Sequence, residues 1–241
     1  RSEIQADFSN DGELIAFTGE YEGPNEIYII AAEGGIPERL TWEENRPEIS
    51  GWTADGKILY SSNYYSTLPD AKLLKLDPET ALSNLIPLSQ ADQGVYTDEG
   101  DLIFTRLRKQ SSHTKRYVGG TAQSIWKFDG KNEAVHLTEE YEGTSKDPMT
   151  YKGRIYFLSD RDGTMNIWSM NTDGEDFKQH TFSSGWDLYE ADMDKGRIVC
   201  QRGADIILYD IDRDKEETLD IKLFSDFDQR RLQWIKNPED R

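Results

Sequence analysis

The sequence predicts an all-β protein, a β-propeller built of four-stranded blades, from three markers that recur in one order. The first marker is a turn glycine at Gly12, Gly56, Gly100, Gly153 and Gly196, with spacings of 44, 44, 53 and 43 residues. The second is a pair of large apolar residues such as Ile-Tyr or Ile-Trp, and the third is a closing Leu-Thr or a similar pair. Four-stranded units of about 40–45 residues are typical of propeller blades. About five blades are therefore expected in this chain.

Each strand of the repeat has its own pattern. The first strand ends in an aromatic or apolar residue before Asp-Gly or Lys-Gly, where a two-residue hairpin turn needs glycine because φ is positive. The second strand is apolar on both faces, as in a sheet covered on both sides, and reads LIAF, ILY, LIF, IYF and IVC. The third strand carries a Tyr or Trp, and the fourth approaches the closing pair. A β-sandwich, the alternative all-β fold, would not explain periodic markers.

The markers divide a single domain, residues 1–241, into consecutive repeats. We expect these repeats at approximately 4–42, 43–90, 91–139, 140–184 and 185–223. Residues 224–241 are then a closing strand or a linker.

Long stretches of these repeats resemble those of a known family. The first repeat contains FSNDGELIAFTGEYEGPNEIYIIAAEGGIPERLT, the third contains SHTKRYVGGTAQSIWKFDG (Ser112–Gly130), and the fourth contains SDRDGTMNIWSMNTDG (Ser159–Gly174). These segments are similar to the N-terminal six-bladed propeller of the tricorn proteases, and the resemblance extends over essentially the whole chain. The Asp-Gly turn motif alone would also fit the WD40-like repeats of TolB.

The tricorn resemblance implies a much larger parent protein. In that family this propeller precedes a seven-bladed propeller, a PDZ domain and two peptidase domains with a serine-based active site. The resemblance implies that the present chain is a non-catalytic propeller that caps the proteolytic chamber and guides peptide passage or domain docking. It also implies a cytoplasmic, homo-oligomeric full-length protein. A free-standing, TolB-like protein-binding propeller stays open as the alternative, and its location would be periplasmic or secreted.

The length predicts an incomplete ring. Six blades of about 45 residues need about 270 residues, whereas the chain has 241. The first repeat opens almost at Arg1, so we expect the remaining blade of a tricorn-like parent upstream of that residue. An open ring exposes two apolar blade faces that are normally covered, and such a patch should drive self-association.

The charge excludes several classes of partner. The chain carries 28 Lys and Arg against 46 Asp and Glu, a formal net charge of −18. Nucleic acids and anionic membranes are therefore not expected as partners, because both require clustered cations. The longest apolar run, Ile27–Ala32, is far shorter than the ~20 residues of a membrane-spanning helix. Cys200 is the only cysteine, and in a second strand we expect it as a small buried hydrophobe.

Motifs for catalysis or metal binding are absent from the sequence. It lacks the Gly-x-Ser-x-Gly, His-Glu-x-x-His, Cys-x-x-Cys and phosphate-loop patterns. His136 and His180 lie near the ends of two fourth strands, which we interpret as equivalent structural positions. Asp160 and Asp162 lack the glycine and acid spacing of a calcium loop. We expect no catalytic residue, cofactor or metal ligand in this chain, although the resemblance implies a parent that is a serine peptidase.

Acidic residues fall on the innermost strands, one in each repeat. They are Asp7, Glu48, Asp92, Asp147 and Asp192. A propeller enzyme with its site in the channel mouth would need His or carboxylate side chains clustered there. Because these acids are distributed one per blade, we interpret them as a ring of negative charge around the axis.

A basic stretch interrupts the acidic chain where the third repeat is about ten residues too long. Residues 106–116 hold five cations and no acid. We expect a projecting loop, which is either merely solvated or a docking or gating element that binds a peptide carboxylate or an acidic neighbouring domain. The candidate contact residues are Arg106, Arg108, Lys109, His113, Lys115, Arg116 and Tyr117.

Overall fold

The computed structural model describes residues 3–68, 70–108 and 116–222, and within these it contains twenty β-strands and no helix. This part of the chain accordingly has no helix long and apolar enough to cross a membrane. The strands form five four-stranded antiparallel sheets, so the all-β propeller predicted from the repeats, with about five blades, is confirmed.

The strands follow one another without interruption by other elements. Blade 1 contains β1 (Glu3–Phe8), β2 (Leu14–Gly19), β3 (Glu26–Ala31) and β4 (Glu38–Arg39). Blade 2 contains β5 (Glu48–Trp52), β6 (Ile58–Ser62), β7 (Lys72–Leu76) and β8 (Ser83–Leu85). Blade 3 contains β9 (Asp92–Tyr96), β10 (Leu102–Thr105), β11 (Ile125–Phe128) and β12 (Val135–His136). Blade 4 contains β13 (Ser145–Tyr151), β14 (Arg154–Ser159), β15 (Asn166–Asn171) and β16 (Lys178–Gln179). Blade 5 contains β17 (Leu188–Asp194), β18 (Arg197–Arg202), β19 (Asp205–Asp210) and β20 (Lys215–Leu219).

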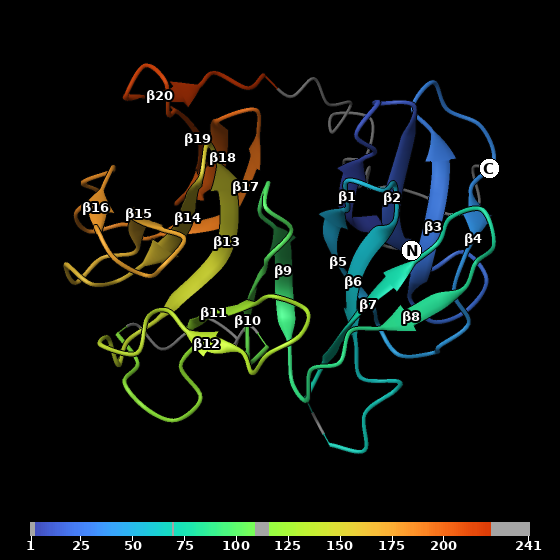
Figure 1. Cartoon of the computed structure of the whole chain (residues 1–241). Coiled ribbons are helices and arrows are strands. Elements are labelled where there is room, and N and C mark those ends of the chain that lie inside the picture. The colour runs from blue at the N-terminus through green and yellow to red at the C-terminus, as the bar shows by residue number, and fades with distance from the viewer. Residues whose placement is uncertain (1–2, 69, 109–115, 223–241) are drawn as a thin grey trace, which may run out of the picture.

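The blades are arranged around a common axis with the first strand of each blade innermost (Figure 1). In every sheet the strands are hydrogen-bonded in chain order from the inside outwards. Consecutive blades meet at the axis, where β1 packs against β5, β5 against β9, β9 against β13, and β13 against β17. This radial repetition is the propeller architecture.

The core consists of four apolar layers, one between each pair of consecutive blades. In the first layer Ile27 of blade 1 packs with Ile58 of blade 2, and in the third layer Ile103 of blade 3 packs with Ile155 of blade 4. All residues of β6 and β10 are buried, including those on both faces of the pleat. The two-sided burial predicted for the second strands is therefore confirmed in the blades that have two neighbours.

Within the described residues, the ring is open between blade 5 and blade 1. On β18, Ile198 and Cys200 are buried against blade 4, whereas Val199 on the opposite face is 38% exposed. On blade 1, Ile15 and Ile30 are paired in register on the face away from blade 2, and both are only half-buried. Among the described residues no apolar layer joins these two blades. This opening agrees with the shortfall expected from the chain length.

The turn after the innermost strand takes two forms. In blades 4 and 5, Lys152-Gly153 and Lys195-Gly196 are two-residue turns with positive φ at both residues, as expected for this hairpin type. In blades 1 to 3 the expectation is wrong, because the turn is longer. There Gly12, Gly56 and Gly100 each donate a backbone hydrogen bond to the carbonyl oxygen three residues earlier, with φ between +74° and +92°.

Glutamate in place of Val199 should weaken self-association of the chain, because it puts a charge on the uncovered face of blade 5. We expect the mass of the wild-type chain, measured by size-exclusion chromatography with light scattering, to rise with concentration, and that of Val199→Glu to stay near the monomer value. Val135→Glu is the matched control, because Val135 is 54% exposed on the outer strand of blade 3. A wild-type chain that is monomeric at every concentration would contradict the prediction.

Candidate functional site: the axial cavity

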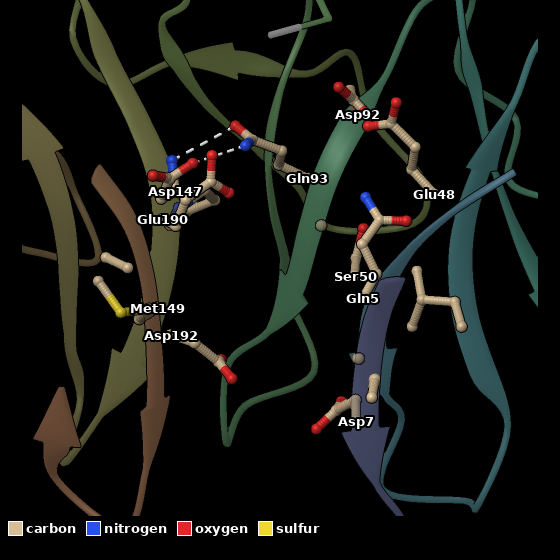
Figure 2. Close-up of a pocket in the computed structure, with 16 residues that line it drawn as sticks. Gln5, Asp7, Glu48, Ser50, Asp92, Gln93, Asp147, Met149, Glu190 and Asp192 are labelled. Carbon is tan, nitrogen blue, oxygen red and sulfur yellow. Dashed lines mark hydrogen bonds between the residues drawn. The ribbon is translucent and has the colours of Figure 1, made fainter. Parts of the chain in front are cut away.

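A cavity of about 320 Å³ lies on the axis and is lined by the five innermost strands. Figure 2 shows its polar residues entering from β1, β5, β9, β13 and β17. All five acids predicted from the sequence to surround the axis line this cavity, so that interpretation is confirmed. The lining also includes a sixth acid and two carboxamides that the sequence analysis missed, namely Glu190, Gln5 and Gln93.

A β-bulge in every innermost strand brings these additional side chains to the cavity. The pairing of each first strand with its second strand shifts register within the strand. At the bulges Gln5, Gln93, Asp147 and Glu190 adopt φ between +42° and +54°, a conformation that costs a non-glycine residue about 1 kcal/mol or more. Bulges redirect side chains and are common beside functional sites. The strain is thus repeated around the cavity wall.

The carboxylates of Asp7 and Asp192 face each other across the open side of the ring (Figure 2). Burial, together with the neighbouring charges of Asp192 and Asp194, raises the pKa of Asp7 to about 6. Neither Asp7 nor Asp192 has an ion-pair partner among the described residues. The like charge of Asp192 thus disfavours the ionised form of Asp7.

Asp92 lies at the other end of the cavity and is almost completely buried. Only 1% of its surface is exposed, and its Oδ2 atom has no hydrogen-bond partner among the described residues. Burial raises the pKa of Asp92 and the charge of Glu48 adds to this shift, whereas the nearby Ser61 hydroxyl opposes it. The charge of Arg108 lowers the pKa in turn.

Asp147 is held by a network that joins blades 3 and 4. The Gln93 side-chain amide donates to Asp147 Oδ1 at 2.6 Å, and the Asp147 N–H donates to Gln93 Oε1 at 3.3 Å. Gln123 donates to the same Gln93 oxygen at 3.0 Å. Lys146 Nζ lies 3.7 Å from Asp147 Oδ2, so this carboxylate has a cation beside it.

The candidate contact residues of the basic insert are divided between solvent and the propeller itself. Arg106 is exposed, donates to Gln90 at 2.8 Å, and lies over the Trp126 ring at 5.9 Å. Arg108 is half-buried, and two of its guanidinium nitrogens are buried without a hydrogen-bond partner in the described part of the chain.

The remaining candidates follow Arg108 in the sequence. Arg116 is exposed and donates to the carbonyl oxygen of Gly163 in blade 4 at 2.6 Å. The Tyr117 hydroxyl accepts a hydrogen bond from Thr121 at 2.9 Å. Lys109, His113 and Lys115 lie outside the described residues.

One serine–histidine pair is present that the sequence analysis did not find. Arg154 donates twice to Ser169 Oγ, at 3.2 and 3.1 Å, so the Ser169 hydroxyl donates to His180 Nε2 at 2.8 Å. His180 Nδ1 in turn lies 3.1 Å from the Tyr209 hydroxyl, which donates to Asp214 at 2.5 Å. Ser169 has no exposed surface, so no substrate can reach it. The chain of hydrogen bonds is a structural link between blades 4 and 5.

The interpretation of His136 and His180 as equivalent residues is wrong by one position. The hydroxyls of Thr138 and Thr181 hold the same place in two blades, each accepting a hydrogen bond from a third-strand N–H. His180 therefore aligns with Leu137. His136 lies one residue before that position in the chain, and its ring stacks on that of Trp126 with the ring centroids 4.3 Å apart. Among the described residues, no three His, Cys, Asp or Glu side chains come together in a way that could hold a metal ion.

Comparison with known families decides the assignment of this propeller. A family model for the tricorn protease N-terminal β-propeller domain matches residues 1–215. The chain belongs to this family. Tricorn protease homolog 1 of Streptomyces coelicolor is 34% identical to this tricorn-family propeller over 223 residues, which cover 89% of the chain and 20% of that protein. The tricorn protease of Thermoplasma volcanium is 28% identical over 230 residues, which cover 90% of the chain and 22% of that protein. The chain thus spans about a fifth of the length of these relatives.

Solved structures show the same fold. The crystal structure of the tricorn protease superposes on this tricorn-family propeller with a TM-score of 0.81 and 24% sequence identity, covering 91% of this chain and 22% of that one. TolB from Acinetobacter baumannii superposes with a TM-score of 0.64 and 15% sequence identity, and the match covers 89% of this chain and 53% of that one. At these identities the likenesses show the fold alone, and the TolB-like alternative is not favoured.

Leucine in place of His180 should make the stability of the propeller less sensitive to acid. Burial lowers the pKa of His180 to about 4, whereas its ordinary value is 6.5. Between these values the unfolded chain binds a proton that the folded chain does not, so the wild type loses stability as the pH falls from 6.5 to 4. At pH 7 the variant should be less stable by about 1–3 kcal/mol, because Ser169 and Tyr209 lose a partner.

Urea unfolding of both proteins at pH 7 and pH 4 measures this difference. We expect the deficit of His180→Leu to shrink at pH 4. A deficit that is unchanged or larger at pH 4 would show that His180 is not held in its neutral form.

Proposed function

We propose that this chain is a non-catalytic propeller of a tricorn-like serine peptidase, and that it covers the proteolytic chamber and lets peptides enter or leave along its axis. The observation that carries the proposal is the polar cavity on the axis of a propeller whose family is that of the tricorn N-terminal domain. The Ser169–His180 pair supports a non-catalytic role because it is closed to substrate. A cytoplasmic location and a homo-oligomeric parent belong to the same proposal.

A sixth blade, supplied by another part of the parent protein, would complete the ring. The proposal is supported by the half-buried Ile15 and Ile30 on one side of the opening and by Val199 on the other. These residues occupy faces that the other blades bury against a neighbour. A domain consisting of five of six blades, residues 1–241, would then be continuous with the parent on both sides of the opening.

The basic insert would dock the propeller onto an acidic partner, either a peptide carboxylate or another domain of the parent. Arg106 and Arg116 are its exposed described cations, and they are the first and last residues of the basic stretch 106–116 within the segment that joins β10 to β11. Arg108 is a weaker candidate for such contacts because two of its guanidinium nitrogens are buried.

The 241-residue chain alone should hydrolyse no fluorogenic peptide above the buffer background, whereas the full-length protein should hydrolyse it. A serine-directed inhibitor should abolish the activity of the full-length protein. Activity that copurifies with the isolated chain and disappears with the same inhibitor would refute the non-catalytic assignment.

Serine in place of both Arg106 and Arg116 should weaken association with the rest of the parent protein while leaving the melting temperature nearly unchanged, because exposed charges contribute little to stability. Pull-down of the remaining domains by the isolated chain measures association. The control is Lys195→Ser/Arg213→Ser, which removes two exposed cations on turns of blade 5 and should bind like the wild type. Equal weakening by the control, or a large fall in melting temperature, would contradict a docking role.

A further inference from the structure

The acidic lining of the axial cavity is only partly neutralised by the chain itself. Lys146 lies beside Asp147, and the charge of Arg108 acts on Asp92. Asp7 and Asp192, in contrast, face each other (Figure 2) without an ion-pair partner among the described residues, and the charge of Asp192 helps to raise the pKa of Asp7. The cavity wall thus keeps uncompensated negative charge on the open side of the ring.

At the buried end of the cavity, one carboxylate oxygen lacks a hydrogen-bond donor. Asp92 is 99% buried, since only 1% of its surface is exposed, and its Oδ2 atom lacks a donor within the described part of the chain. It lines the cavity beside Glu48, whose charge raises the pKa of Asp92 (Figure 2). Buried carboxylate oxygens nearly always accept a hydrogen bond. The wall of the cavity therefore includes a carboxylate that lacks a full set of donors.

We propose that the axial cavity binds the positively charged groups of peptides, namely a lysine ammonium, an arginine guanidinium or the N-terminal ammonium. Such groups carry three to five N–H donors and no acceptor, which matches a wall of carboxylate and carboxamide oxygens. The cavity volume of about 320 Å³ is at the lower end of ligand pockets, so it suits one side chain or a short extended segment. This inference rests on the proposed function, because it names the peptides that the axis selects.

Other cations fit the cavity less well. Among the described residues no group of three metal-ligating side chains is close enough to hold an ion. A free polyamine offers the same ammonium chemistry but has no peptide backbone. The bulges of β1 and β17 interrupt the sheet ladder, and the backbone groups of their extra residues can hydrogen-bond to an extended peptide.

Isothermal titration calorimetry on the 241-residue chain tests the proposal, at about 0.15 M salt, where charges beyond about 8 Å are largely screened. The probes are Ac-Ala-Lys-Ala-Arg-Ala-NH2, the same peptide with glutamine at both charged positions, spermidine, and calcium chloride. We expect the cationic peptide to bind at least about tenfold more tightly than the glutamine peptide. The double variant Asp7→Asn/Asp192→Asn and the single variant Asp92→Asn should each remove most of this preference.

The matched control is Glu13→Gln/Glu33→Gln, which removes two charges from exposed turns of blade 1 and should keep the full preference. Equal loss in this control would overturn the proposal, because binding would then be nonspecific attraction to a chain of net charge −18. If Asp92→Asn does not fold, the double variant Asp7→Asn/Asp192→Asn still tests whether the cavity carboxylates cause the preference for the cationic peptide.

The remaining outcomes separate this inference from the proposed function. Equal binding of the two peptides would overturn charge selection while leaving a peptide channel in place. Binding of neither peptide would overturn both. Tighter binding of spermidine or calcium than of the cationic peptide would overturn a peptide as the occupant.

Discussion

Each blade of this propeller is a sheet with two apolar faces, and both faces must be covered by something other than water. Blades 2, 3 and 4 meet this requirement with their neighbours, and the second strands β6 and β10 are consequently buried throughout. The ring geometry follows, because only a circular arrangement gives every sheet two neighbours. At the opening the requirement is met only in part. Tyr21 packs against Phe17 and Tyr28 on blade 1, whereas Val199 on blade 5 stays exposed.

The arrangement of sheets around an axis also brings the innermost strands together. The bulges in these strands determine which side chains line the axial cavity. A regular strand would point alternate residues into the cavity and the others into the sheet contacts. The extra residues at Gln5, Gln93, Asp147 and Glu190 turn additional polar side chains towards the axis at the cost of backbone strain. The same wall then accumulates carboxylates whose charge the fold leaves partly unpaired. The acidity of the axis is thus a consequence of the inner-strand geometry.

The sequence was sufficient for the features that repeat with the blade. The glycine spacing and the two-faced second strands predicted the propeller, and the position of Asp92 at the start of a first strand predicted its place at the axis. A bulge adds one residue without a compositional marker, so Gln93 could not be assigned to the cavity. Arg108 was expected in a projecting loop, but its charge acts on Asp92, a contact between segments that no local pattern encodes. His180 was misaligned because Leu137 holds the corresponding position in blade 3.

Photo-crosslinking from position 199 in the full-length protein tests the central claim most directly, namely that residues 1–241 form an open ring completed by another part of the parent. A photoreactive amino acid in place of Val199 reports by mass spectrometry which segment covers the free face of blade 5. The account predicts adducts in a segment outside residues 1–241. Adducts confined to blade 1, residues 3–39, would mean that five blades close on themselves in the parent, and would contradict the account.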